Sequence, residues 1–221
     1  MNNCIFEKAD QFFDNIPATK DAYKGKKKHN YIRWYNFYFS CIKDSNLNIL
    51  EIGVDRGVSL KIWKEYFKNS NIYGIEKNTS FINKDLVKGC KIFEGDHNNI
   101  EFLKKVCKSI KGKFDIIIDD GSNIPSEQIK IFEYLFKKLN QGGIYVIENL
   151  QTSYQDKFRT KDYRSAIEFL RNKIDDINFN GKFMCNSFER IKKKSSHLTK
   201  YEKSISGISF YTGICFIFKR F

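Results

Sequence analysis

The sequence predicts a doubly wound α/β fold, in which a mostly parallel seven-stranded sheet has helices on both faces and ends in an antiparallel hairpin. Five short apolar runs alternate with stretches in which apolar residues recur every three or four positions. The runs are apolar on both faces, as a parallel sheet covered by helices requires. Two further β-rich runs meet around Thr212-Gly213, which predicts the hairpin.

The predicted strands, in chain order, are residues 49–52, 71–75, 90–93, 114–118 and 143–147, of which the third is the weakest. Helical spacing covers residues 59–69, 81–88, 100–111 and 126–139, and another helix is predicted at about 165–177. The hairpin occupies residues 205–219. Ligands of such sheets bind beyond the carboxyl ends of the strands, so functional residues should follow each strand.

The composition predicts one domain. The 221 residues are 41% hydrophobic and contain two prolines and no low-complexity linker. We expect a cofactor-binding core at 46–155, an N-terminal cap or lid at 1–45, and a helix with the hairpin at 156–221. The six cysteines are scattered singly, which indicates reduced thiols. No apolar run is long enough to span a membrane and no signal peptide is evident, so the expected location is cytoplasmic.

The net charge of +13 raises the question of nucleic-acid binding. The excess is almost all lysine and is spread along the chain, whereas arginine, the better reader of phosphates, is scarce. Nucleic acid is therefore the less favoured partner. The basic, aromatic segment 26–35 has two interpretations, a substrate lid for an anionic acceptor or an amphipathic helix with a solvated basic face.

A glycine-bearing turn follows the first predicted strand. Gly53-Val-Asp-Arg-Gly57 leads from that strand into helical spacing, and backbone N–H groups in such a turn can meet a nucleotide-like ligand. The alternative is a tight turn without a ligand. The turn lacks the middle glycine of a dinucleotide fingerprint, which disfavours an NAD-dependent oxidoreductase.

Acids lie in or directly after every predicted parallel strand. Like charges at one edge repel, so this rim favours a cationic ligand, a metal ion or hydroxyl donors as partners. Glu76 is placed to bind a ribose diol, or to cap the helix after it. Asp96 is placed to accept from an adenine amino group, or to cap the helix at 100–111. The acids are Glu51, Glu76, Asp96, Asp119, Asp120 and Glu148.

The stretches Asp119-Asp-Gly-Ser-Asn123 and Glu148-Asn149 predict a metal site. Carboxylate and amide oxygens from neighbouring strand ends are ligands that Mg²⁺ accepts. The alternative is an Asx-type turn at Asp120-Gly121 beside a buried, hydrogen-bonded Glu148.

Taken together, these residues resemble class I S-adenosylmethionine-dependent methyltransferases. More narrowly, residues 29–154 resemble the metal-dependent sugar O-methyltransferases of macrolide biosynthesis, and the stretch Gly142-Gly-Ile-Tyr-Val-Ile-Glu-Asn-Leu-Gln-Thr-Ser-Tyr154 is the most specific part. The resemblance implies a Rossmann-like methyltransferase fold, S-adenosylmethionine and Mg²⁺ or a similar cation. The cofactor-binding residues expected are Glu51, Gly53, Gly57, Glu76, Asp96 and Asp119. The metal ligands expected are Asp120, Glu148 and residue 149.

Two positions depart from the family. Asn149 replaces its last metal-binding acid, and Asn123 replaces the histidine that is its proposed base. Asn149 still offers a carbonyl oxygen, but Asn123 cannot take a proton at neutral pH. His97, His29, Asp120 and water on the metal are the alternatives as base.

The sequence therefore favours O-methylation of a sugar hydroxyl on a glycan, a nucleotide-linked sugar or a glycosylated natural product. An RNA or DNA methyltransferase and an inactive methyltransferase-fold binding protein are the alternatives, and a homo-oligomer remains open.

Overall fold

The computed structural model describes residues 31–161, 163–179 and 198–221. The chain divides into two compact units, Met1–Ser109 and Ile110–Phe221. The predicted boundaries at 45 and 155 do not coincide with this division, and the domain organisation stays a prediction. His29 and the lysine run at 24–28 lie outside the described residues, as do Cys4, Cys185 and residues 192–194.

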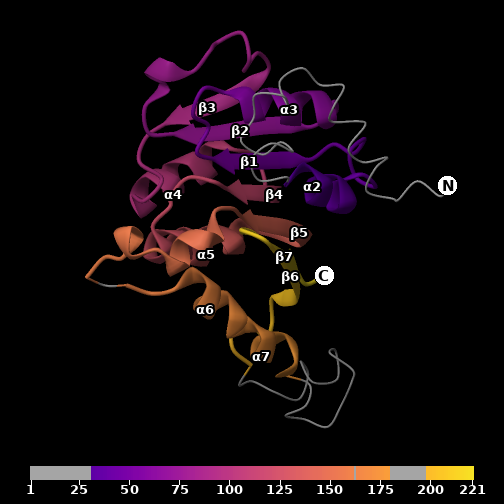
Figure 1. Cartoon of the computed structure of the whole chain (residues 1–221). Coiled ribbons are helices and arrows are strands. Elements are labelled where there is room, and N and C mark those ends of the chain that lie inside the picture. The colour runs from indigo at the N-terminus through magenta and orange to yellow at the C-terminus, as the bar shows by residue number, and fades with distance from the viewer. Residues whose placement is uncertain (1–30, 162, 180–197) are drawn as a thin grey trace, which may run out of the picture. The chain divides into compact units, whose positions relative to one another are not determined.

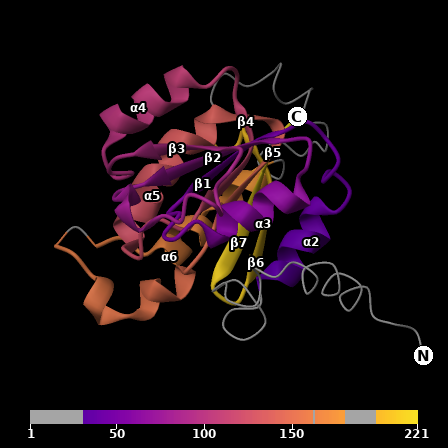
Figure 2. The ribbon, with the colours of Figure 1, turned by 90° about the horizontal axis from the view of Figure 1, so that it is seen from above.

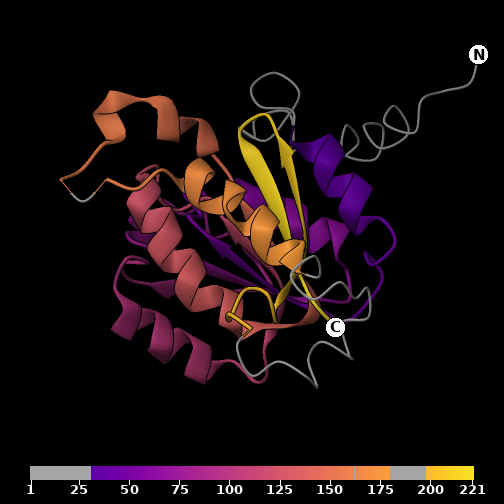
Figure 3. The ribbon, with the colours of Figure 1, turned by 90° about the horizontal axis from the view of Figure 1, so that it is seen from below.

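The first unit contains three parallel strands that lie side by side in Figure 1. Leu50 pairs with Tyr73, and Tyr73 pairs with Lys91. Helices α2 and α3 lie on one face of these strands and α4 lies on the other, as Figures 2 and 3 both show. The elements are α2 (Ile32–Phe39), β1 (Asn48–Ile52), α3 (Val58–Tyr66), β2 (Asn71–Glu76), the 3₁₀ helix η2 (Thr79–Phe81), β3 (Cys90–Glu94) and α4 (Ile100–Ser109).

An aromatic cluster joins α2 to α3. Tyr35 and Phe39 are fully buried, and the Tyr35 ring meets Trp63 edge-on at 4.8 Å between centroids. Phe39 packs on Phe67 at 5.6 Å. Phe37, on the opposite face of α2, is 50% exposed. Residues 32–35 of the predicted lid or amphipathic segment are thus helical, with Ile32 and Tyr35 buried, whereas residues 26–30 lie outside the described residues; the choice between the two interpretations stays a prediction.

The predicted helix at 81–88 is wrong. The structure has only the short η2 there, followed by turns. Asn78 and Asn83 accept hydrogen bonds from the N–H groups of Ser80 and Asp85, two residues ahead of each. Such local bonds compete with a helix, and Phe81 is 70% exposed, so no apolar face supports one.

The second unit contains the parallel pair β4–β5 and the antiparallel strands β7 and β6, with β7 beside β5. Helix α6 packs against α5, and α7 packs against β6 (Figure 3). The predicted helix at about 165–177 is present as two short helices. The elements are β4 (Phe114–Asp119), α5 (Pro125–Leu135), β5 (Leu139–Ile147), α6 (Ala166–Arg171), α7 (Lys173–Ile177), β6 (Ile205–Tyr211), β7 (Ile214–Lys219), and the 3₁₀ helices η3 (Phe136–Lys138), η4 (Leu150–Tyr154) and η5 (Asp156–Phe158).

The strand order is β3-β2-β1-β4-β5-β7-β6, with the terminal hairpin at one edge. This confirms the predicted seven-stranded, mostly parallel fold.

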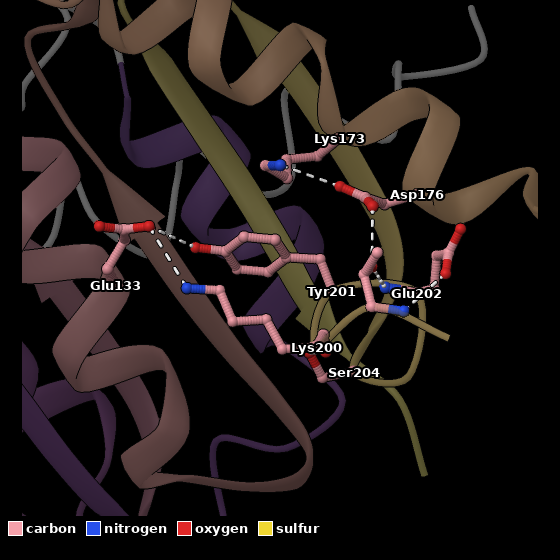
Figure 4. A network of polar contacts seen from close by, with 8 residues as sticks. Glu133, Lys173, Asp176, Lys200, Tyr201, Glu202 and Ser204 are labelled. Carbon is pink, nitrogen blue, oxygen red and sulfur yellow. Dashed lines mark hydrogen bonds and ion pairs between the residues drawn. The ribbon is translucent and has the colours of Figure 1, made fainter. Parts of the chain in front are cut away.

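A polar network fastens the turn before β6 to two helices of the second unit (Figure 4). Tyr201 donates its hydroxyl to Glu133 Oε1 of α5 at 3.1 Å. Asp176 of α7 accepts from the Thr199 hydroxyl at 3.1 Å and from Lys173 at 2.9 Å. The Lys173 ammonium also lies 4.3 Å from the Tyr201 ring centroid. These contacts hold the start of the hairpin in place.

No helix of the described residues has the length and apolar character needed to cross a bilayer. Four cysteines lie within those residues and form no disulfide there: Cys41, Cys90, Cys107 and Cys215.

Candidate functional site

The loop after β1 has an unusual backbone. Gly53, Asp55 and Gly57 all have left-handed conformations, with φ of +81°, +48° and +90°. A Cβ on Gly57 would lie 2.6 Å from Val87 Cγ1, so the loop requires glycine there for two reasons, conformation and space. The loop ends at the N-terminus of α3, as the sequence predicts.

Glu76 lies against this loop. Its Oε2 atom accepts the N–H groups of Val54 and Asp55, each at 2.9 Å. Its Oε1 atom accepts from the backbone N–H groups of Lys77 at 2.8 Å and Asn78 at 3.3 Å. Asn78, not Glu76, is the residue that caps η2, so the capping alternative for Glu76 is wrong. The structure therefore places a half-buried carboxylate at the carboxyl end of β2, beside the glycine loop.

Asp96 does not cap α4. The Asn99 Oδ1 atom accepts from the N–H groups of Glu101 at 3.0 Å and Phe102 at 3.3 Å, so Asn99 is the capping residue. Asp96 is exposed, accepts from the Asn98 N–H at 3.0 Å, and lies 3.8 Å from the ammonium of Lys77. The adenine role of Asp96 stays a prediction.

His97 is one of the two predicted proton acceptors within the described residues, and Asp120 is the other. The His97 side chain directly follows Asp96 in the chain and is half-buried.

Glu51 is fully buried, and its Oε2 atom accepts a hydrogen bond from the Ser59 hydroxyl at 2.7 Å. This contact fixes the first turn of α3 on β1. A direct cofactor contact of Glu51 stays a prediction.

Asp119 is built into the core of the second unit, at 1% exposure. The Tyr145 hydroxyl donates to its Oδ2 atom at 2.9 Å, and the Gly121 N–H approaches Oδ1 at 3.4 Å. Burial raises the pKa of Asp119 to about 7, although both donors act in the opposite direction. The Asx-type contact expected of Asp120 is made by Asp119 instead. These contacts give Asp119 a local structural role, and its cofactor role stays a prediction.

The predicted metal ligands lie on two neighbouring loops, residues 119–123 and 148–149, which we call the acidic loop pair. The Glu148 N–H donates to the Asp119 carbonyl at 3.0 Å. The Asn149 side-chain N–H donates to Asp120 Oδ1 at 2.6 Å. Asn149 has a left-handed backbone, with φ of +59°, which asparagine tolerates better than most residues. The structure therefore brings Asp120 and Asn149 together. Asn123 is exposed.

The donors of the acidic loop pair fit a divalent cation. Asp120, Glu148 and Asn149 offer the hard oxygens that Mg²⁺ prefers, provided that the Asn149 amide turns its Oδ1 toward the ion. Glu148 is buried, at 2% exposure, as the alternative interpretation also expected. No group of three or more His, Cys, Asp or Glu side chains suited to a metal occurs among the described residues, and the metal ligands stay a prediction.

Two residues of this region were missed by sequence reasoning, Tyr145 and Gln128. Gln128 is polar yet falls at the apolar spacing of α5 with Pro125, Phe132 and Leu135, all of them buried. A polar residue on a buried helix face was the available signal.

This fold and these strand-end acids define the class: the chain has the class I S-adenosylmethionine-dependent methyltransferase fold. It superposes on the MycE methyltransferase of the mycinamycin biosynthetic pathway, solved with Mg and SAH, with a TM-score of 0.75 at 24% identity over 97% of this chain and 53% of that chain. A second MycE structure, which also contains mycinamycin VI, gives a TM-score of 0.72 at 24% identity over 99% and 55%. No family model matches the chain.

By sequence the chain is similar to curated O-methyltransferases. It is 28% identical over 204 residues to the 8-demethyl-8-alpha-L-rhamnosyl tetracenomycin-C 2'-O-methyltransferase of Streptomyces olivaceus, covering 87% of this chain and 50% of that protein. It is 34% identical over 144 residues to the mycinamicin VI 2''-O-methyltransferase of Micromonospora griseorubida, covering 59% and 35%. The chain spans about half the length of the first relative and about a third of the length of the second. The resemblance seen in the sequence is thus confirmed.

Proposed function

We propose that this protein transfers a methyl group from S-adenosylmethionine to a hydroxyl of a sugar, with the help of a divalent cation. The observation that carries the proposal is the position of Glu76, a strand-end carboxylate held against the left-handed glycine loop. A ribose diol binds a carboxylate in that position in dinucleotide folds. The names of the relatives, all O-methyltransferases, support the reaction type.

The proposal assigns two groups of residues. Glu76, Asp96 and the turn at 53–57 are assigned to the nucleoside, and Asp120, Glu148 and Asn149 are assigned to the cation. When bound, the sulfonium cofactor supplies the methyl group and the cation lowers the pKa of the acceptor hydroxyl. Methyl transfer from a sulfonium neutralises charge, so the chain's own task is to align the acceptor and to take its proton. Asp120 and His97 are the described candidates for that proton.

The acceptor follows from the relatives. The names of two relatives specify a rhamnosyl tetracenomycin and an L-olivosyl-oleandolide as substrates, and the name of a third specifies mycinamicin VI. We infer a glycosylated small molecule as the substrate class here, with a nucleotide-linked sugar and RNA as the alternatives. The relatives favour a sugar over a nucleic acid, although the net charge of +13 is compatible with both.

The first test is the affinity for S-adenosylhomocysteine, measured by isothermal titration calorimetry. Glu76→Gln is expected to raise its dissociation constant about 10- to 100-fold, because a hydrogen bond to a charged group contributes about 1.5–3 kcal/mol. The control is Glu65→Gln on α3, whose side chain is 40% exposed and whose carboxylate lies 3.8 Å from the Lys61 ammonium. That variant should bind like the wild type. Equal affinity of the Glu76 and Glu65 variants would contradict the assignment of Glu76.

The second test is turnover. Labelled methyl transfer should occur to a glycosylated polyketide from a panel that also contains a nucleotide-linked sugar and a short RNA. A chelator should abolish this transfer while leaving S-adenosylhomocysteine binding unchanged, because the nucleoside and the cation have separate ligands. Turnover that survives chelation would remove the cation from the proposal. Methylation of the RNA alone would make RNA, and not a sugar-bearing molecule, the substrate class.

A further inference from the structure

Gln128 of α5 is a fully interior amide, at 1% exposure. Its Nε2 atom donates to the carbonyl oxygen of Ser122 and to that of Glu148, each at 3.0 Å. Carbonyl oxygens only accept hydrogen bonds, so the NH₂ end of the amide must face them, and this fixes the orientation of the side chain.

The two carbonyl groups belong to the two halves of the acidic loop pair. Ser122 lies two residues after Asp120, and Glu148 directly precedes Asn149. One side chain thus hydrogen-bonds to the backbone of both loops that carry the predicted metal ligands. The Asn149–Asp120 contact at 2.6 Å joins the same two loops through their side chains.

Packing alone does not explain an amide at this position. The Gln128 Oε1 atom is buried and has no hydrogen-bond partner among the described residues. A buried acceptor without a partner carries a free-energy cost that a methionine of similar volume would not carry. The two hydrogen bonds to the loops are what the amide contributes in return.

We propose that Gln128 is a positioning residue that sets the separation of the two loops, so that Asp120, Glu148 and Asn149 present their oxygens to one cation. It acts through the backbone of Ser122 and Glu148 and does not touch the ion. This inference rests on the cation of the proposed function. Residues that orient metal ligands typically change metal affinity 10- to 100-fold when they are replaced.

The test compares Gln128→Met with Asn140→Leu in the full chain. Asn140 is the matched control, because its side-chain N–H donates to Asp115 Oδ1 at 2.7 Å and so ties β5 to β4 far along both strands from the acidic loop pair. The dissociation constant of Mn²⁺ is measured by electron paramagnetic resonance, and that of S-adenosylhomocysteine by calorimetry.

Gln128→Met is expected to weaken Mn²⁺ binding about 10- to 100-fold and to leave nucleoside binding within about twofold. Asn140→Leu should leave both unchanged. A general loss of stability would not produce this split. Unchanged Mn²⁺ affinity in Gln128→Met, or an equal loss in Asn140→Leu, would overturn the proposal.

Hydrogen exchange separates a failure of this inference from a failure of the proposed function. The N–H groups of Glu148 and Ile124, bonded to Asp119 O and Ser122 Oγ, report on the two loops. Both should exchange at least about tenfold faster in Gln128→Met than in Asn140→Leu. If the wild-type protein binds no Mn²⁺ but exchange still differs between the two variants, the cation is removed from the proposal and the loop-positioning role of Gln128 is kept. Equal exchange in the two variants would overturn that role.

Discussion

Phe39→Ala is expected to lower the free energy of unfolding by about 3–5 kcal/mol, the usual cost of removing a fully buried phenylalanine. The ring is completely enclosed and packs on Trp63 at 6.4 Å and on Phe67 at 5.6 Å between centroids. Little can move into the space, because α2 and α3 are held together by other rings of the same cluster. Chemical denaturation followed by circular dichroism measures the change.

Phe37→Ala is the matched control for that experiment. Phe37 lies on the same helix, two residues away, and is 50% exposed. Its replacement should change the unfolding free energy by no more than about 0.5 kcal/mol. If both variants lost the same small amount of unfolding free energy, α2 would be a loosely attached segment, which would favour the lid interpretation of residues 26–35.

Asn149→Asp is expected to raise the affinity of the acidic loop pair for Mg²⁺ and Mn²⁺ by at least about tenfold. The change replaces an amide that donates to Asp120 with a third carboxylate. Two unit charges 4 Å apart attract each other by about 4 kcal/mol at an effective dielectric constant of 20, and the attraction grows with the charge of the ion. Without a cation the variant should be less stable than the wild type, because two like charges replace the 2.6 Å hydrogen bond. Added Mg²⁺ should reverse this loss.

Asn140→Asp provides the comparison, since it creates the same aspartate pair elsewhere. Asn140 donates to Asp115 at 2.7 Å, as Asn149 does to Asp120, but no predicted metal ligand lies beside it. Thermal unfolding with and without Mg²⁺ should therefore show a cation-dependent gain in Asn149→Asp only. A similar gain in both variants would mean that the cation acts through general charge screening.

The strands were predictable because parallel strands under two layers of helices need apolar side chains on both faces. The strands predicted at 71–75 and 114–118 are each one residue longer in the structure, and the added residue is an acid, Glu76 in β2 and Asp119 in β4. The wrongly predicted helix at 81–88 has apolar residues at helical spacing, but the sequence does not reveal that Phe81 is left exposed. The third strand was weak because β3 is half-exposed along its length.

For the site, the sequence identified which residues follow each strand but not what their side chains contact. It left Asp96 open between a ligand role and a cap, since capping depends on which of Asp96 or Asn99 lies at the helix start. Gln128 was missed because its partners are backbone carbonyls 6 and 20 residues away, which no spacing rule connects. Tyr145 was missed for a similar reason, since its partner Asp119 lies 26 residues away.

The four backbone hydrogen bonds accepted by Glu76 have a kinetic consequence. Because this carboxylate already organises the loop before any nucleoside arrives, docking has little ordering entropy to overcome. Association should then be a single fast phase whose rate rises linearly with nucleoside concentration, and differences in affinity among variants of this loop should appear in how quickly the nucleoside leaves.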